Sequence, residues 1–347
     1  MFQGKNLTKI ALVSVGAIIL SFVVTKMHDK NNKEDLEDDY KKIQTYLLND
    51  SPLYGYNRPK MWIHSKYEIN ARNWKSFQSR NTTDLNQPYL HLTIKSILNY
   101  NSDDFNICLI DDNSFKRLIP SWDVDLQSMA EPMKTHFREL GMLMLVYYYG
   151  GMVVPNSFIC LRKLLPFYEK YANGDKFFAT ENVNKINDMQ KYTENYDFVP
   201  DIFICGANKN NETLMEIISQ VQNELKSGHF TSENDFKGYL STNLLSQYKI
   251  GKITLVNGKE VGVKDNKNNQ ILLDDLMEEK LLNVGKYIYG VHIPSDELLK
   301  RTKYSWFAVM SEEELLKTRI ALTKYLKVST VDALDCQTLK SKTVVSI

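Results

Sequence analysis

Short apolar stretches alternate with amphipathic ones from Pro59 onward, which predicts a domain in which strands and helices follow one another. Runs of about four to eight apolar residues favour strands, and apolar residues every three or four positions favour helices. Strands are predicted at residues 60–65, 105–112, 176–182 and 197–207, with a late strand region at 281–294. Helices are predicted at residues 88–100, 133–149, 210–225 and 311–327, with a further helix start near 113. This alternation is typical of an α/β fold with a mainly parallel sheet flanked by helices.

The segment YYYGGMVVPNSF, residues 147–158, joins one of these helices to a strand. The helix before it is apolar on most faces and is therefore expected to be buried. A Gly-Gly turn and a short apolar strand follow, and the strand leads into Pro155, Asn156 and Ser157. Proline fixes φ and lacks an N–H, so we expect a stiff loop after this strand. The helix at 311–327 opens on a capping box of Ser311 and Glu314.

The N-terminal region differs from the rest of the chain. Residues 10–25 carry no charge and lie between Lys9 and Lys26. Their helical length of roughly 24 Å falls short of a ~30 Å hydrocarbon core, but flanking lysines can snorkel. An uncleaved single-pass transmembrane anchor is predicted; a cleaved signal peptide is the alternative, although no small-x-small site follows. The expected organisation is a short tail at 1–9, the anchor at 10–25, a charged stalk at 26–57, a globular domain at 58–327 and a loosely ordered tail at 328–347.

Charge and cysteine content narrow the classes of function. The 43 basic and 42 acidic residues give a net charge of +1, which disfavours a nucleic-acid partner. Cys108, Cys160 and Cys205 lie in apolar runs, and Cys336 lies near the C-terminus, with no zinc-type spacing among them. Buried, reduced thiols and a reducing compartment are the simplest interpretation.

The segment PYLHLTIKSILNYNSDDFNICLIDDNSFKRLIP, followed by an apolar helix, YYYGG and a strand, resembles DXD-type glycosyltransferases, including the capsular-polysaccharide-synthesis type. The resemblance covers roughly residues 59–167. The segments EINARNWKSFQSR and YGGMVVPNSFICL also resemble, in amino-acid sequence, membrane proteins of large DNA viruses of algae and protists. The second resemblance suggests a viral protein in a host or virion membrane and carries no known chemistry.

The glycosyltransferase resemblance implies a GT-A-like, Rossmann-like sheet that binds a nucleotide sugar at the carboxyl ends of its strands. In that family an Asp-x-Asp motif holds Mn²⁺ or Mg²⁺ against the departing diphosphate. Here Pro155 and Ser157 occupy the two aspartate positions, while Glu139 and Met142 replace a helix aspartate and arginine. Arg138 substitutes for that arginine only if the helix rotates. The metal motif is therefore degenerate, and Mn²⁺ or Mg²⁺ is expected only if other acidic residues form a replacement site.

Candidate site residues follow from the strand ends and from the resemblance. Asp111 and Asp112 end a predicted strand and could hold a nucleotide or a displaced metal; the alternative is that Asp112 or Asn113 caps the next helix. His292, after the late strand, matches a position where some GT-A enzymes place a third metal ligand; a structural histidine is the alternative. The nucleotide-sugar-binding candidates are His64, Asp111, Asp112, Glu139, Gly150, Gly151, Asn156 and Ser157. The catalytic candidates are Glu181, as a general base, and Asp235, near an acceptor; a solvated loop acid and a helix-start residue are their respective alternatives.

Two functions remain open on the sequence alone. One is a membrane-anchored glycosyltransferase-like protein with weak or metal-independent transfer from a nucleotide sugar to a glycan acceptor. The other is a catalytically inactive relative, a pseudoenzyme that acts as a binding or structural membrane protein. Glycosylation sequons at Asn6, Asn49, Asn81 and Asn211 matter only in a secretory lumen.

Overall fold

The computed structural model describes residues 58–65, 87–184, 196–227 and 233–330. The predicted anchor, the stalk and most of the predicted tail lie outside these residues. Among the helices described, none is both long enough and apolar enough to cross a membrane.

The central sheet has strand order β2-β1-β3-β6-β5-β7 over the described residues. β1 is parallel to β2 and β3, and β5 is parallel to β7. β6 is antiparallel to both of its neighbours, so it runs against the other strands of a mainly parallel sheet. The bounds are β1 (Lys60–His64), β2 (Asn106–Ile110), β3 (Gly151–Val153), β5 (Phe177–Val183), β6 (Phe198–Ala207) and β7 (Ile253–Val256). A separate antiparallel pair consists of β4 (Phe158–Cys160) and β8 (Gly290–His292).

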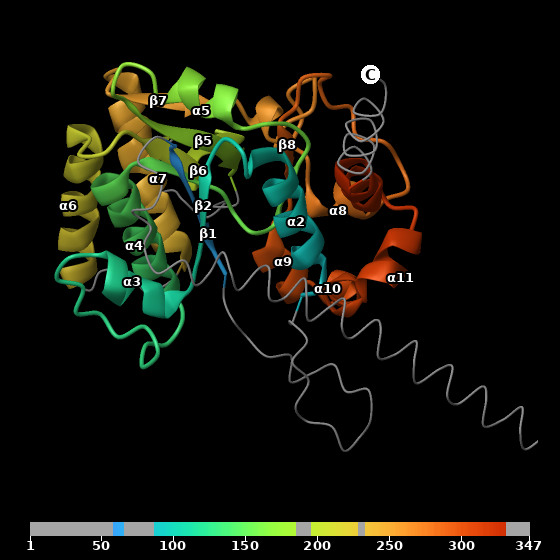
Figure 1. Cartoon of the computed structure of the whole chain (residues 1–347), viewed down its shortest axis with the longest axis horizontal. Helices are drawn as coiled ribbons and strands as arrows, with labels where there is room; N and C mark the ends of the chain where they lie inside the picture. The colour runs from blue at the N-terminus through green and yellow to red at the C-terminus, as the bar shows by residue number, and fades with distance from the viewer. Residues whose placement is uncertain (1–57, 66–86, 185–195, 228–232, 331–347) are drawn as a thin grey trace, which may run out of the picture. The chain divides into compact units, whose positions relative to one another are not determined.

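The helices form two groups, each with its own buried core, one on the central sheet and one around the β4–β8 pair (Figure 1). The first group packs on the sheet through Trp62, Phe115, Leu145 and Ile217, among others. It comprises α3 (Asp112–Leu118), α4 (Met133–Tyr149), α6 (Glu212–Ser227) and α7 (Glu233–Lys249). The second group surrounds the β4–β8 pair and comprises α2 (Tyr89–Asn101), α8 (Leu273–Met277), α9 (Ser295–Lys300), α10 (Ser305–Val309), α11 (Glu312–Lys317) and a helix at 321–330. The remaining elements are α5 (Leu165–Tyr171), η1 (Gly258–Glu260) and η2 (Thr302–Tyr304).

The turn between α4 and β3 depends on two glycines. Gly150 ends α4 at φ 72°, and Gly151 opens β3 at φ 97°, where side chains are strained. A Cβ on Gly151 would lie 2.1 Å from the carbonyl oxygen of Lys60. The indole N–H of the buried Trp62 donates to the Gly150 carbonyl over 3.0 Å. The glycines therefore let α4 end tightly against β1 and deliver β3 beside it.

Most predicted elements are confirmed, some to the residue. The helix at 133–149 coincides with α4, and the capping box of Ser311 and Glu314 is present. The prediction of one helix at 311–327 was wrong, because α11 stops at Lys317 and Thr318 turns into extended backbone. The Thr318 hydroxyl bonds the Leu315 carbonyl and the Thr323 hydroxyl, which stabilises the break. The late strand region is reduced to the three residues of β8.

The structure also describes one predicted glycosylation sequon and three of the cysteines. The sequon asparagine Asn211 is 1% exposed, its side-chain oxygen accepts from Leu214 N–H at the start of α6, and its amide donates to the Asp175 carbonyl. Asn211 is therefore a structural cap in the fold. Burial is confirmed for Cys160 and Cys205, while Cys108 is half-buried, and all three are free thiols. The other sequons and Cys336 lie outside the described residues.

Substituting Gly151 tests the close approach of β3 to β1. We expect Gly151→Ala to lower the free energy of unfolding by about 3 kcal/mol or more, because the methyl group meets backbone in addition to a strained φ. Gly174→Ala is the matched control: its φ is 74°, and no heavy atom lies within 4 Å of the added methyl. The control should lose only about 1 kcal/mol. Equal losses in urea unfolding would contradict this account of the turn.

Candidate functional site

The candidate site lies where β1, β2 and β3 end. From β1 the chain adds β2 on one side and then crosses to add β3 on the other, so the strand order reverses at β1. Open α/β sheets bind ligands in the crevice beyond the carboxyl ends of strands at such a switch point. His64 ends β1, Asp111 follows β2, and Pro155 follows β3 by one residue. Three segments distant in sequence therefore meet at one edge of the sheet.

Asp112 and Arg138 form the strongest polar contact at this edge. The Arg138 Nε and Nη2 atoms donate to the two Asp112 carboxylate oxygens over 2.7 and 2.6 Å. Arg138 Nη1 also donates to Glu131 over 3.2 Å. The guanidinium is only 9% exposed, so this bidentate pair is largely shielded from water. It ties the start of α3 to α4 directly below the end of β1.

His64 joins the same pair. Its Nε2 lies 3.0 Å from Asp112 Oδ1, and its ring stacks on Phe115 at 5.6 Å between centroids. Burial alone would raise the pKa of Asp112, but the hydrogen bonds from Arg138 and His64 outweigh it and hold the pKa well below its usual range. A charged Asp112 can only accept, so His64 Nε2 carries the proton. Nδ1 is then the ring nitrogen left for a ligand, on a side chain that is 14% exposed.

The loop at the degenerate Asp-x-Asp position is fixed by structural hydrogen bonds. The Thr93 hydroxyl donates to the Asn156 carbonyl, and the Ser157 hydroxyl donates to the Ile293 carbonyl over 2.9 Å. Ile293 N–H donates back to the Ser157 carbonyl over 3.2 Å. Ser157 is 1% exposed, so its hydroxyl faces the interior rather than a ligand. The loop is held against α2 and β8.

This donor set does not fit a divalent metal. Pro155 has no ligand atom, and the Ser157 hydroxyl is already used. Over the described part of the chain, no three His, Cys, Asp or Glu side chains come close enough together to hold a metal ion. Asp112, which could have supplied a carboxylate, is neutralised by Arg138. Hard cations require several oxygen ligands, and these residues do not provide them.

Glu181 lies at the same edge but is engaged by other groups. Its carboxylate accepts from the Gly258 N–H over 2.9 Å and pairs with Lys264 Nζ at 2.5 Å. Lys264 is 8% exposed and also lies over the Phe198 ring. These contacts join the end of β5 to the segment after β7. A general base must accept a proton, so Glu181 would first have to give up Lys264.

Beside Glu181, half-buried side chains form a polar and aromatic patch. The Asn182 amide donates to Asp201 Oδ2 over 2.7 Å across β5 and β6. The His292 ring contacts Phe203 at 4.3 Å between centroids. Phe158 pairs with His292 between β4 and β8, so His292 lies next to the fixed loop after β3. Asn182, Asp201, Phe203 and His292 are called the side patch below.

The remaining candidates are distributed as follows. Asp111 is the N-cap of α3 and forms a capping box with Ser114, so the cap is Asp111 rather than the Asp112 or Asn113 expected from sequence. Glu139 is half-buried on α4, where its charge, after burial and Asp201, helps to raise the pKa of Cys205. Asp235 lies near the start of α7.

Gly150 and Gly151 shape the turn at the opposite end of β3, one strand length from the crevice. They position the strand and do not lie at its carboxyl end.

Sequence reasoning missed the residues that organise this edge. Arg138 lies beside Glu139, the family aspartate position, and was expected to replace the family arginine only if the helix rotates, yet it reaches Asp112 across 26 positions of sequence. Lys264 and Asp201 carried no motif at all. One signal was an arginine in a helix that is apolar on most faces, since a buried guanidinium needs a carboxylate partner.

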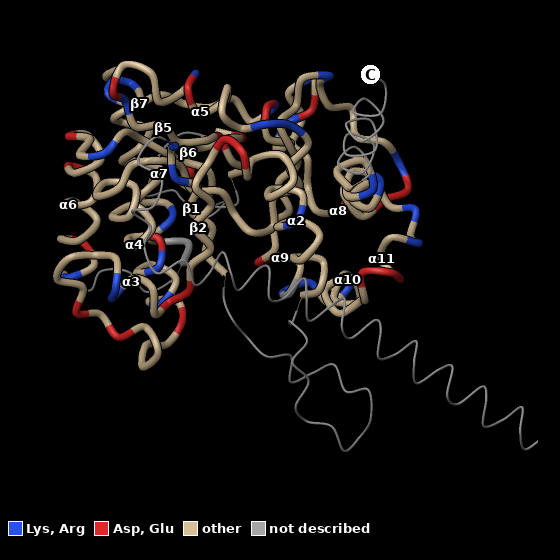
Figure 2. Tube along the Cα trace, in the orientation of Figure 1, with Lys and Arg blue, Asp and Glu red and all other residues tan. Residues whose placement is uncertain are grey.

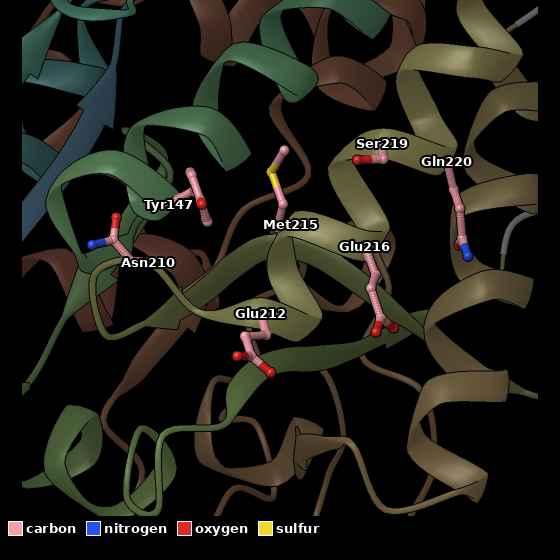
Figure 3. Close-up of a pocket in the computed structure, with 7 residues that line it drawn as sticks. All are labelled: Tyr147, Asn210, Glu212, Met215, Glu216, Ser219 and Gln220. Atoms are coloured by element: carbon pink, nitrogen blue, oxygen red, sulfur yellow. The ribbon is translucent and has the colours of Figure 1, made fainter.

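A depression of about 570 Å³ lies elsewhere on the surface, between the end of α4 and α6 (Figure 3). It contains Tyr147, Met215 and the carboxylates of Glu212 and Glu216, without a basic side chain in its lining. Tyr147 precedes the turn into β3, so the depression is at the end of the sheet opposite His64. Glu216 is paired with Lys252, and the Glu212 carboxylate would repel a diphosphate, so this depression is a poor nucleotide site. Acidic and basic residues are otherwise interspersed along the chain (Figure 2).

Comparisons with known proteins give distant likenesses. No family model and no curated protein matches the sequence. Similar solved structures include the PaToxG glycosyltransferase, at 14% identity over 63% of this chain and 78% of that one, with a TM-score of 0.32. The galactosyltransferase LgtC, in complex with donor and acceptor sugar analogs, shows 9% identity over 78% and 95%, with a TM-score of 0.38. The apo-form glycosyltransferase GlyE of Streptococcus pneumoniae TIGR4 shows 11% identity over 82% and 64%, with a TM-score of 0.39. Scores this low assign no family.

A double-mutant cycle on Asp112 and Arg138 tests the pair. We expect Arg138→Gln to lower the free energy of unfolding by about 2–4 kcal/mol, because it leaves a half-buried carboxylate without its partner. Adding Asp112→Asn should recover about 1–3 kcal/mol as coupling energy. The exposed pair of Lys252 and Glu216, at 2.6 Å, is the matched control and should couple by less than about 1 kcal/mol.

The coupling should also depend on pH with a definite sign. Because the folded-state pKa of Asp112 is depressed below the unfolded value of about 4, the stabilisation is present above that value and lost as pH falls through the folded-state pKa. A coupling no larger than that of the control pair at pH 7 would show that Asp112 and Arg138 are not the constraint at this edge.

Proposed function

We propose that this chain is a GT-A-like glycosyltransferase-like protein that binds a nucleotide sugar at the carboxyl ends of β1 and β3. The single observation that carries the proposal is the reversal of strand order at β1, where His64 ends the strand and, among the described residues, no hydrogen bond engages its Nδ1. The glycosyltransferase resemblance of residues 59–167 agrees with this placement. A diphosphate needs hydrogen-bond donors, and His64 Nδ1 becomes one when the ring is protonated, since Nε2 already donates to Asp112.

The glycan acceptor is proposed to bind at the side patch. Sugars pack their C–H faces on aromatic rings and exchange hydrogen bonds with amides and carboxylates. Phe203 and His292 supply half-buried rings. Asp201 supplies a carboxylate from β6, the neighbour of β3, and Asn182 supplies an amide from β5, the next strand along. Asp201 is the carboxylate we propose to accept the acceptor's proton, since Glu181 is paired with Lys264.

A non-catalytic binding protein is the second candidate. It is favoured by the Ser157 hydroxyl, which is buried on Ile293 where the resemblance expects a metal ligand. Such a protein would bind the nucleotide sugar or a glycan without transfer. Membrane attachment through residues 10–25, and with it a viral membrane setting, belongs to either version of the proposal and rests on the sequence alone.

Calorimetric titration of the full-length protein with UDP-glucose, UDP-galactose and GDP-mannose tests the proposed function. We expect at least one to bind with micromolar to millimolar affinity in the presence of a chelator. His64→Ala should weaken binding by about tenfold through the loss of one hydrogen bond to a charged group. Met215→Ala, in the α4–α6 depression, is the control and should bind as the wild type does.

The same samples separate the two candidates. Release of free nucleoside diphosphate in the presence of a mixed glycan acceptor indicates transfer. Asp201→Asn should reduce the rate of this release by at least about tenfold. Binding without release supports the non-catalytic candidate. No binding of any sugar nucleotide, or loss of binding in the Met215 variant alone, would contradict the proposed site.

A further inference from the structure

The charges around His64 give the proposed donor site an unusual electrostatic setting. Asp112 on α3 contacts this ring, Arg138 on α4 contacts Asp112, and Glu131 contacts Arg138. Asp111 lies just before Asp112 and caps α3. Two carboxylates, those of Asp112 and Glu131, thus contact one guanidinium, and a third, that of Asp111, adjoins them in the chain. With a neutral imidazole this cluster carries two net negative charges, which would oppose a diphosphate at short range.

Protonation of His64 changes that balance. An imidazolium halves the net negative charge of the cluster and turns Nδ1 from an acceptor into a donor. Asp112 already accepts from Nε2 at 3.0 Å, so its charge stabilises the imidazolium as it forms. Arg138 holds Asp112 in place through two hydrogen bonds, so the carboxylate cannot turn away. Histidine is the side chain that changes charge between about pH 5 and 8.

We propose that nucleotide-sugar binding at this site is coupled to uptake of one proton by His64, so that an imidazolium held by Asp112 supplies the positive charge opposite the diphosphate. The inference rests on the proposed function and deepens it. The proton comes from solvent and binds Nδ1, which then donates to a diphosphate oxygen, while Nε2 keeps its hydrogen bond to Asp112. His64 is the ligand-contacting group, and Asp112 and Arg138 are positioning residues. The described residues at this edge do not fit a divalent metal. A diphosphate still needs a positive charge beside it, and the imidazolium of His64 supplies that charge.

Calorimetry of the full-length protein with UDP-glucose and GDP-mannose, in a chelator and over pH 5.5 to 8.5, tests the coupling. The diphosphate of these probes is esterified at both ends and does not titrate in this range. Affinity should fall by up to about tenfold per pH unit above neutrality, the limit for one linked proton. Titration at one pH in two buffers of different ionisation enthalpy should show uptake of up to one proton, and this readout needs no variant.

Variants assign the proton to its residue. His64→Gln keeps a donor toward Asp112 and should bind with an affinity that changes less than about twofold over the same range. Asp112→Asn should move the pH dependence to lower pH, because the imidazolium loses its partner charge. His91→Gln is the matched control: His91 Nδ1 lies 3.1 Å from Glu312 in the second helical group, so it is also a histidine paired with a carboxylate. The affinity of this variant for the nucleotide sugar should change with pH as that of the wild type does.

The outcomes separate this inference from the proposed function. Binding that is independent of pH, or pH dependence that survives in His64→Gln, overturns the proton coupling and leaves the nucleotide-sugar site standing. Binding in His64→Gln that is flat with pH, beside a wild type and His91→Gln that both titrate, supports the coupling. No binding at any pH contradicts both.

Discussion

The bidentate contact between Asp112 and Arg138 fixes the edge of the sheet on which the proposed function depends. It joins α3 to α4, and α4 in turn ends at the Gly150–Gly151 turn that sets β3 against β1. His64 is held from the side by the same carboxylate. Because a shielded ion pair of this kind is costly to break, these segments keep one arrangement. The crevice at the strand-order reversal is therefore built from stiff parts.

That stiffness limits the chemistry available at the edge. Arg138 and Lys264 are cations, but each is already paired with a carboxylate, and the Ser157 hydroxyl is buried on a carbonyl. In the part of the chain that the structure describes, one ring nitrogen of His64 and the side patch formed by Asn182, Asp201, Phe203 and His292 remain for a ligand at this edge. These groups suit hydrogen bonding to a diphosphate and to a sugar better than they suit coordination of a metal. Side chains of this chain, rather than a bound metal, are therefore proposed to recognise the nucleotide sugar.

Local pattern predicted much of the fold, because each element carries its own periodicity. The 3.6-residue repeat gave α4 and α6 their bounds within a few residues, and the apolar run of β2 was equally plain. The antiparallel direction of β6 could not be predicted, since strand direction depends on partners far away in sequence. For the site, too, local features were predictable and long-range contacts were not. Strand-end positions such as His64 and Asp112 were visible in the sequence, whereas the pairing of Asp112 with Arg138 depends on how α4 rotates against β1.

The most direct test of the central claim is a crystal structure of the full-length protein with UDP-glucose bound. We predict that the diphosphate lies beyond the carboxyl ends of β1 and β3, within hydrogen-bonding distance of His64 Nδ1, with the Asp112–Arg138 pair unchanged. A nucleotide bound in the depression between α4 and α6, or a diphosphate that displaces Asp112 from Arg138, would contradict it.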